Sequence, residues 1–268
     1  MSVYLGYLKI RFLDNIQYKI AALAGVLTQF AWGGMYIMLF ATFLKNGTSS
    51  DMSISQMSTY IWLQQAFFMM FNLWSIDRDV LDTVTSGNIA MELVKPVDLY
   101  NIWHARNFGL KMGTTILRCV PMIIICMLLP LGEYGLAAPS SITNFIFFVI
   151  TLILSMFLVI SYIMIMFGVL MSTVSAHGIR IAFQLVSEFL SGLVIPIAFM
   201  PDFLVKIIKF TPFYYMQNVS FNIYSGYISD ISEMIKIVGV QVFWLLLLTI
   251  IGKILIKKQE KKIVVQGG

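Results

Sequence analysis

The chain has 268 residues, of which 59% are hydrophobic and only 12% are charged, and its net charge is +5. A soluble domain carries about 25% charged residues, so this composition excludes an ordinary soluble protein and indicates lipid as the solvent. The positive charge lies in predicted inner loops and a C-terminal lysine cluster, and we therefore expect lipid contacts and no nucleic-acid partner. The predicted fold class is an all-α integral membrane protein, with one transmembrane domain over residues 1–268.

Residues 1–19 mix basic side chains such as Lys9 and Arg11 with leucine and isoleucine. This mixture is typical of a helix that lies in the plane of the membrane interface. The alternative is a cytoplasmic extension of the first span. We predict an interfacial elbow helix here, followed by six transmembrane helices.

Long windows with little or no charge predict the spans, because a membrane helix needs about 20 apolar residues. The predicted spans are about 20–44, 54–76, 112–131, 142–173, 181–200 and 237–256. The short turn before the fifth span contains His177 and Gly178. The predicted architecture ends with a C-terminal lysine cluster that acts as a stop-transfer anchor.

The fifth span is too short to cross as one helix. Its apolar run from Ile181 to Ile195 covers about 22 Å at about 1.5 Å per residue, against a hydrocarbon core of about 30 Å. Pro196, Pro201 and Pro212 follow. Since broken helices at membrane depth are tolerated only inside protein or beside water, we predict a re-entrant helical hairpin over 201–235.

The distribution of basic residues predicts the orientation. With the N-terminus inside, all but four of the eighteen lysines and arginines face the cytoplasm; the exceptions are Lys45, Lys206, Lys209 and Lys236. Positive charge concentrates on the cytoplasmic side of membrane proteins. We therefore predict a multi-pass protein of the cell (plasma) membrane with both termini in the cytoplasm, and residues 77–111 as its sizeable inner polar region.

This inner region contains a short amphipathic segment. Gly87-Asn88 signals a turn, and Pro96 ends any helix that follows it. Between them, Ile89, Leu93 and Val97 form an apolar stripe, while Glu92 and Lys95 are spaced to pair. Such a helix is suited to docking another protein; the alternative is a helix that rests on the bilayer surface.

Two motifs resemble one transporter family. The run Gly-x-Ile-Ala-x-x-Leu-Val-Lys-Pro-Val, from Gly87 to Val97, resembles the loop between spans two and three of type-2 ATP-binding-cassette (ABC) exporter permeases that lack their own ATPase domain. Leu190 to Leu204, followed by Thr211-Pro-Phe-Tyr-Tyr215, is similar to the family's fifth span and hairpin. One departure is Val219-Ser-Phe221, where many relatives have a proline.

The resemblance implies a permease subunit of an ATP-driven exporter. It implies a coupling helix that contacts a cytoplasmic ATPase subunit through Gly87, Ile89, Glu92, Leu93, Lys95 and Pro96, and a gate at Gly192, Pro196, Pro201 and Pro212. It also implies a second permease copy or a sister permease as partner. The chain itself has no Gly-x-x-x-x-Gly-Lys-Ser/Thr phosphate loop, so ATP and magnesium are expected on the partner chain and no cofactor on this one.

A few residues within the spans are candidates for the translocation path: Phe67, Phe68, Phe183 and Glu188. An intramembrane carboxylate is costly and is by default a functional candidate. The alternative for Glu188 is structural pairing with Arg180 or with Arg118, and Arg118 itself is expected to snorkel toward the inner surface. His104 and His177 have no further ligands at metal-binding spacing, so no metal site is predicted.

Two other functions compete with the exporter. A secondary transporter or channel usually shows paired broken helices, whereas the sequence predicts a single broken span. An intramembrane enzyme needs a convergent catalytic set, and none is evident. We therefore predict a transport subunit and not an enzyme.

Overall fold

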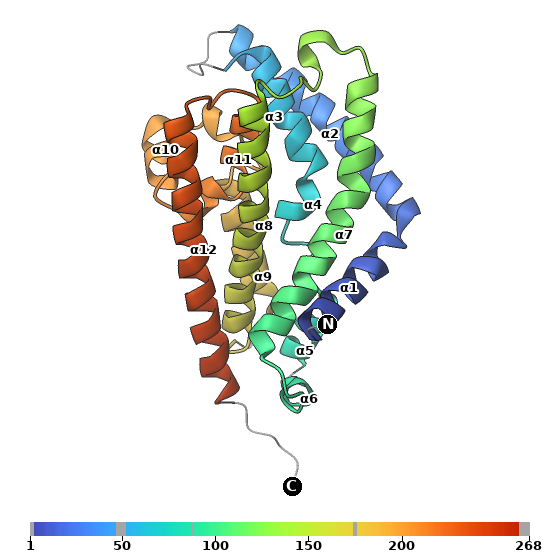
Figure 1. The fold of residues 1–268 in the computed structure, drawn as a ribbon, viewed down its shortest axis with the longest axis vertical. Coiled ribbons are helices and arrows are strands. Elements are labelled where there is room, and N and C mark those ends of the chain that lie inside the picture. The colour runs from blue at the N-terminus through green and yellow to red at the C-terminus, as the bar shows by residue number, and fades with distance from the viewer. Residues whose placement is uncertain (1–2, 47–51, 87, 174–175, 263–268) are drawn as a thin grey trace.

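The computed structural model describes residues 3–46, 52–86, 88–173 and 176–262, and these residues form a helical bundle without strands. The helices are α1 (Val3–Ile16), α2 (Lys19–Lys45), α3 (Ile54–Ala66), α4 (Phe68–Phe71), α5 (Arg78–Thr85), α6 (Ile89–Leu93), α7 (Leu99–Leu128), η1 (Gly132–Tyr134), α8 (Ile142–Leu170), α9 (Ala176–Leu190), η2 (Ile197–Phe199), α10 (Asp202–Ile208), η3 (Pro212–Tyr215), α11 (Asn218–Tyr224) and α12 (Ile231–Glu260). Figure 1 shows α5, α6 and the end of α12 at one end of the bundle, with α10 and α11 in the other half.

Within the described residues, four helices are long and apolar enough to cross a membrane: α2, α7, α8 and α12. The all-α class is confirmed, and the first, third, fourth and sixth predicted spans correspond to α2, α7, α8 and α12. The remaining two predicted spans are interrupted or short helices, so the count of six crossings stays a prediction.

The third span begins much earlier than residue 112. Asp98 caps α7, and its carboxylate accepts a hydrogen bond from the Asn101 N–H at 2.8 Å. An aspartate in this position satisfies one of the free N–H groups of the first turn. Consequently residues 99–111, predicted as part of the inner region, form the first turns of α7, which continues through Pro121.

The second span is not one continuous helix. α3 ends at Ala66, the short α4 follows Phe67, and Asn72 has an extended backbone. The fully buried Lys111 of α7 donates hydrogen bonds to the carbonyls of Met69, at 3.1 Å, and Asn72. The predicted uninterrupted helix over 54–76 is therefore wrong, and a lysine from a neighbouring helix satisfies the carbonyls that the break exposes.

The break in the fifth span lies earlier than Pro196. α9 ends at Leu190, and Gly192 has a φ of +83°, a left-handed conformation that glycine adopts without steric cost. Gln64 of α3 donates to the carbonyls of Gly192, at 2.9 Å, and Leu193, at 3.3 Å. α9 also begins before Ile181, so His177 and Gly178 belong to its first turn and not to the preceding loop.

The chain after the break folds into the bundle. α11 is buried and packs against α8 and α3. Asn144 of α8 donates to the carbonyls of Ile223 and Ile228, and Gln241 of α12 donates to the Tyr215 carbonyl at 2.8 Å. α11 is a regular helix through Val219-Ser-Phe221. The re-entrant course of 201–235 relative to a membrane stays a prediction.

Candidate coupling site

A buried carboxylate caps the N-terminus of α5. Asp77 is 1% exposed, and its side chain accepts a hydrogen bond from the Val80 N–H, as expected of an N-cap. The Asp77 N–H donates to the side chain of Asn107 in α7 at 3.1 Å. The start of α5 is thus fixed to α7 by the main chain as well as by its cap.

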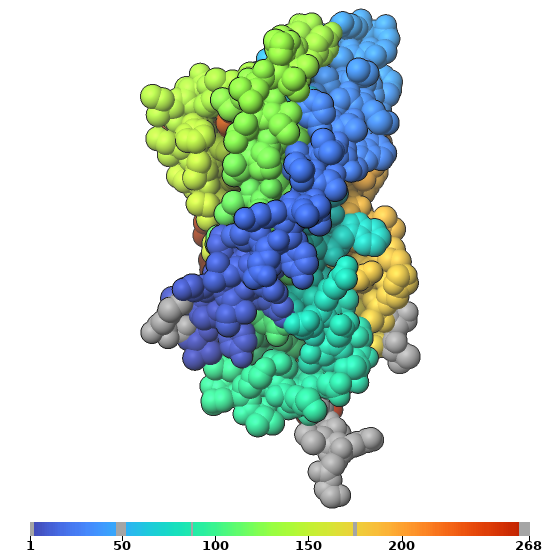
Figure 2. All heavy atoms as spheres, turned by 90° about the vertical axis from the view of Figure 1, so that its right-hand side faces the viewer, coloured from blue at the N-terminus to red at the C-terminus, as the bar shows by residue number. Residues whose placement is uncertain are grey.

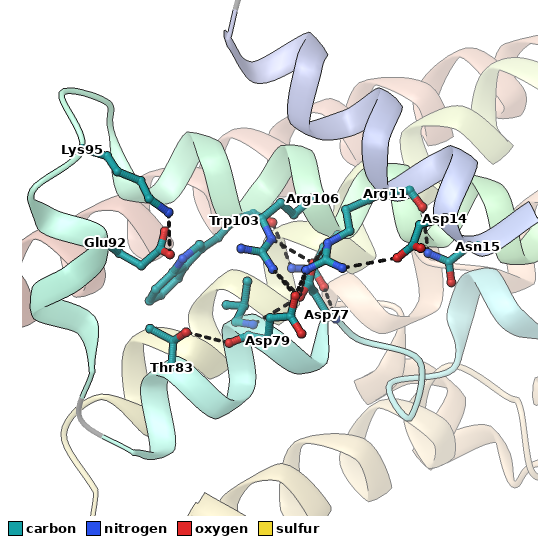
Figure 3. A network of polar contacts seen from close by, with 12 residues as sticks. Arg11, Asp14, Asn15, Asp77, Asp79, Thr83, Glu92, Lys95, Trp103 and Arg106 are labelled. Carbon is teal, nitrogen blue, oxygen red and sulfur yellow. Dashed lines mark hydrogen bonds and ion pairs between the residues drawn. The ribbon is translucent and has the colours of Figure 1, made fainter.

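Two arginines from different helices converge on this carboxylate. Arg11 of α1 pairs with Asp77 at 2.8 Å, and Arg106 of α7 pairs with it through two contacts at 2.9 Å. Asp79 contacts both guanidinium groups, the one from Arg106 at 3.1 Å. Figure 3 shows the two arginines pointing at the same pair of aspartates, which joins α1, α5 and α7.

The paired charges stabilise one another electrostatically. A hydrogen bond from Arg11, together with the positive charges of Arg11 and Arg106, lowers the pKa of Asp79 below its ordinary value of 3.8. The same carboxylates raise the pKa of Arg11, even though partial burial opposes its charge.

Figure 2 shows α1 lying along the surface directly beside the segment that contains α5, with the α6 region below it.

The tip of this region exposes apolar side chains. Ile89 is buried and Val97 is partly buried against the core, so these two members of the predicted stripe face inward. The exposed side chains are instead Met91 at 75% and Val94 at 84%, with Leu93 at 39%.

The polar residues of the tip also have defined places. The predicted pair of Glu92 and Lys95 is confirmed at 2.7 Å. Glu92 is 13% exposed and points toward Trp103 of α7 (Figure 3), so it faces inward. Pro96 is exposed. Gly87 lies outside the described residues.

The predicted gate residues lie at successive boundaries between short elements. Gly192 is at the break after α9, Pro196 precedes η2, Pro201 precedes α10, and Pro212 is the first residue of η3. This segment lies in the opposite half of the bundle from α6 (Figure 1). The structure therefore separates the two groups of predicted site residues along the length of the molecule.

The predicted phenylalanines of the path have different surroundings. Phe67 packs against the rings of Phe148 and Phe221, and Phe183 packs against Tyr162. Phe68 lines a cavity of about 440 Å³ between α2, α3 and α7. Their role in a path stays a prediction.

The alternative in which Glu188 pairs with Arg180 or Arg118 is not found, because no ion pair joins Glu188 to either arginine among the described residues. Glu188 accepts a hydrogen bond from Gln184 at 2.8 Å. Arg180 lies over the Trp74 ring at 5.9 Å, and the Arg118 guanidinium lies against Gly25 of α2. Helix α9 thus satisfies Glu188 with its own neighbour at i−4, which the spacing of the two residues could have indicated.

The ion network of Arg11, Asp77, Asp79 and Arg106 was not predicted. Its one sequence signal is the alternating charge of Asp77-Arg78-Asp79. Arg11 and Arg106 are distant in sequence, and only the packing of α1 on α7 brings them together. In the part of the chain that the structure describes, no group of three or more histidine, cysteine or acidic side chains is placed to hold a metal ion.

Comparison with known proteins gives a family. No curated protein and no solved structure matches the chain significantly. The family described as ABC-2 family transporter protein matches residues 30–267, which is most of the chain. Membrane-spanning helices and this family together indicate a multi-pass membrane protein that serves as a transport subunit. The chain belongs to the ABC-2 family of transporter proteins, as a permease of that type.

Proposed function

We propose that this chain is the membrane-spanning permease subunit of an ATP-driven exporter, and that it docks a separate cytoplasmic ATPase through α6. The observation that carries the proposal is the exposed apolar tip of Met91, Leu93 and Val94, held on a base of buried ion pairs. Apolar side chains at the centre of a protein contact supply most of its binding energy. Because the ion pairs hold α5 against α1 and α7, a force on the tip would displace whole helices. On this topology both termini and α6 are cytoplasmic.

The contacts behind the tip offer a route for movement. Asp77 connects α5 to Arg106 of α7, and Lys111 of the same helix holds the carbonyls of Met69 and Asn72. Gln64 of α3, in turn, donates hydrogen bonds to the carbonyls of Gly192 and Leu193 after α9. A displacement of α5 by the ATPase would therefore reach α7, the break in the second span and the break at Gly192 through contacts between packed helices.

ATP supplies the difference in free energy between the states of such a machine. Closure of two ATPase subunits would favour one arrangement of the permease helices, and ATP hydrolysis would release it. A second permease copy or a sister permease would complete the path, and the segment from Gly192 to Pro212 would act as its outer gate. This chain contributes the path and the coupling contacts, while ATP and magnesium bind the partner.

Co-purification with the ATPase tests the docking. Val94→Asp and Met91→Asp each place a charge in the proposed contact, and we expect at least a tenfold loss of ATPase recovered with the tagged permease. Phe203→Asp is the matched control, because Phe203 is 67% exposed at the other end of the bundle. Undiminished recovery with both tip variants would instead support a tip that rests on the bilayer surface.

A secondary transporter or channel is the second candidate, favoured by one observation. The expected single broken span is wrong, since the second span is interrupted at Phe67 as well as the fifth at Gly192. Paired broken helices are usual in secondary transporters. Transport by the purified chain along an ion gradient, without any ATPase, would establish this function; strict dependence on an ATPase and ATP would exclude it.

A further inference from the structure

The cavity between α2, α3 and α7 has a polar wall and an aromatic wall. It holds about 440 Å³; Gln29, Gln65 and Arg118 contribute polar side chains, and Trp32, Tyr36 and Phe68 contribute rings. Leu193, which directly follows Gly192 at the break after α9, also lines it. The cavity thus borders the interrupted second span at Phe68 and the break after α9 at Leu193, and no residue of the coupling tip lines it.

Arg118 carries a charge into this cavity, and the described residues supply no counterion for it. It lies within α7, is partly buried, and no carboxylate of the described residues lies within 4.0 Å of it. A Cβ on Gly25 would lie 2.5 Å from the guanidinium carbon, so the absence of a side chain at Gly25 leaves the space that Arg118 occupies. An arginine does not deprotonate in a protein, and an unpaired charge at membrane depth indicates a functional site.

Gln29 is a second, independent sign of a missing partner. Its side chain belongs to a residue that is 5% exposed, and neither the amide nitrogen nor the amide oxygen has a hydrogen-bond partner in the described part of the chain. Buried polar groups are normally satisfied, and an unsatisfied one is unfavourable. Because Gln29 lines the same cavity as Arg118, one ligand can satisfy both side chains.

The chemistry of the walls defines the ligand. A guanidinium presents a planar fork of donors that matches the oxygens of a carboxylate or a phosphate. Gly25 lies about 9 Å along α2 from Lys19 at about 1.5 Å per residue, which is the depth of the inner leaflet on the predicted topology. The rings and the exposed apolar face of α2, which includes Leu23 and Leu27, suit a hydrocarbon chain.

We propose that this cavity binds the anionic head of an amphiphile, with Arg118 and Gln29 on its phosphate or carboxylate and the hydrocarbon chain along α2. The same chemistry has two sources: a resident anionic phospholipid, or a single-chain amphiphile that the transporter moves. The site goes beyond the proposed function, since binding requires neither the ATPase nor a direction of transport.

Binding to the full purified chain in dodecyl maltoside, a neutral detergent, tests the site. The probes are dodecyl phosphate and phosphatidylglycerol, with dodecylphosphocholine as the zwitterionic comparison, and native mass spectrometry measures bound probe. We expect dodecyl phosphate to bind at least tenfold more tightly than dodecylphosphocholine. Arg118→Gln should abolish this preference, whereas Arg78→Gln, which removes an exposed arginine outside the cavity, should leave it unchanged.

Gly25→Ala keeps the charge and tests the geometry. The added methyl group would occupy the position of the guanidinium, and we expect binding of dodecyl phosphate to weaken several-fold; this variant also answers the question if Arg118→Gln does not fold. Phosphatidylglycerol that co-purifies and resists displacement by dodecyl phosphate would identify a resident lipid, and ready displacement would identify a site for single-chain amphiphiles. Equal binding of both dodecyl probes, or a preference untouched by Arg118→Gln and Gly25→Ala, would overturn the proposal.

Discussion

Two structural roles converge on the carboxylate of Asp77. It caps α5, and it neutralises the guanidinium groups of Arg11 and Arg106. Arg106 is 8% exposed, so it depends on this carboxylate for its charge balance. Removing one partner of a buried ion pair leaves the other charge uncompensated, which destabilises a protein far more than the loss of a surface pair.

Asp77→Asn should therefore destabilise the fold. We expect a loss of about 3 kcal/mol, the lower end of the usual range for a broken buried pair, because Arg11 still reaches solvent. Thermal unfolding of the purified protein in detergent measures it. Asp82→Asn removes an exposed aspartate of the same helix and should change the unfolding temperature little. Equal effects of the two substitutions would show that the network does not hold α5.

Acidification should weaken the same network through Asp79. Its pKa is lower in the folded protein than in the unfolded chain, so its contribution to stability is present at neutral pH. That contribution should disappear as the pH falls below about 4 and through the lowered pKa. The unfolding temperature of the wild type and of Asp79→Asn, compared from pH 7 to pH 3, should converge at the acidic end; a constant difference would contradict this.

At the scale of the elements, the break between α3 and α4 and the break after α9 are stabilised in the same way. In each, backbone carbonyls lose their helical partners, and a polar side chain from a neighbouring helix takes their place: Lys111 for α4 and Gln64 for the end of α9. Unsatisfied carbonyls are unfavourable in an apolar surrounding, so these two side chains fix where the helices end.

Gly192→Ala tests the second break. Its φ of +83° is unfavourable for alanine, and the new Cβ would lie 2.9 Å from the Ile197 side chain and 3.2 Å from the Ile197 nitrogen. We expect a loss of about 1–2 kcal/mol and impaired transport with ATPase docking intact. Gly34→Ala is the control, since open space surrounds that position in α2. Pro196→Ala should impair transport less, because the break lies before it; the reverse order would return the hinge to the proline.

At the scale of the molecule, the coupling tip and the gate segment lie in opposite halves of the bundle (Figure 1). α7 runs from beside α5 toward the other end and contacts α1, α2, α3 and α8. A long helix transmits a displacement along its length, and its side-chain contacts decide which neighbours follow. The proposed route therefore depends on Lys111, through which α7 donates hydrogen bonds to the interrupted second span.

Lys111→Met should separate docking from transport. Methionine keeps a similar volume but cannot donate to the carbonyls of Met69 and Asn72. We expect normal recovery of the ATPase with the permease and at least a tenfold loss of ATP-dependent transport in proteoliposomes. Lys257→Met, at an exposed position near the end of α12, is the control. Full transport by Lys111→Met would exclude this contact from the route.

The sequence by itself determined the class of protein and the family. Shortage of charge and long apolar windows are sufficient for a helical membrane protein, because lipid allows few other structures, and the motifs around Gly87 and Gly192 point to the family that the comparison then found. The tip pair of Glu92 and Lys95 was predictable as well, since local helical spacing decides it.

Only the tertiary structure decided where helices begin, break and meet. The start of α7 at Leu99, the interruption at Phe67 and the break at Gly192 each depend on a side chain that caps the backbone, two of them from another helix. The ion network and the contact of Arg118 with Gly25 likewise depend on residues far apart in sequence. The hydrophobic pattern of the sequence indicates which side chains prefer lipid or the protein interior. Contacts between residues far apart in sequence form only when the helices pack.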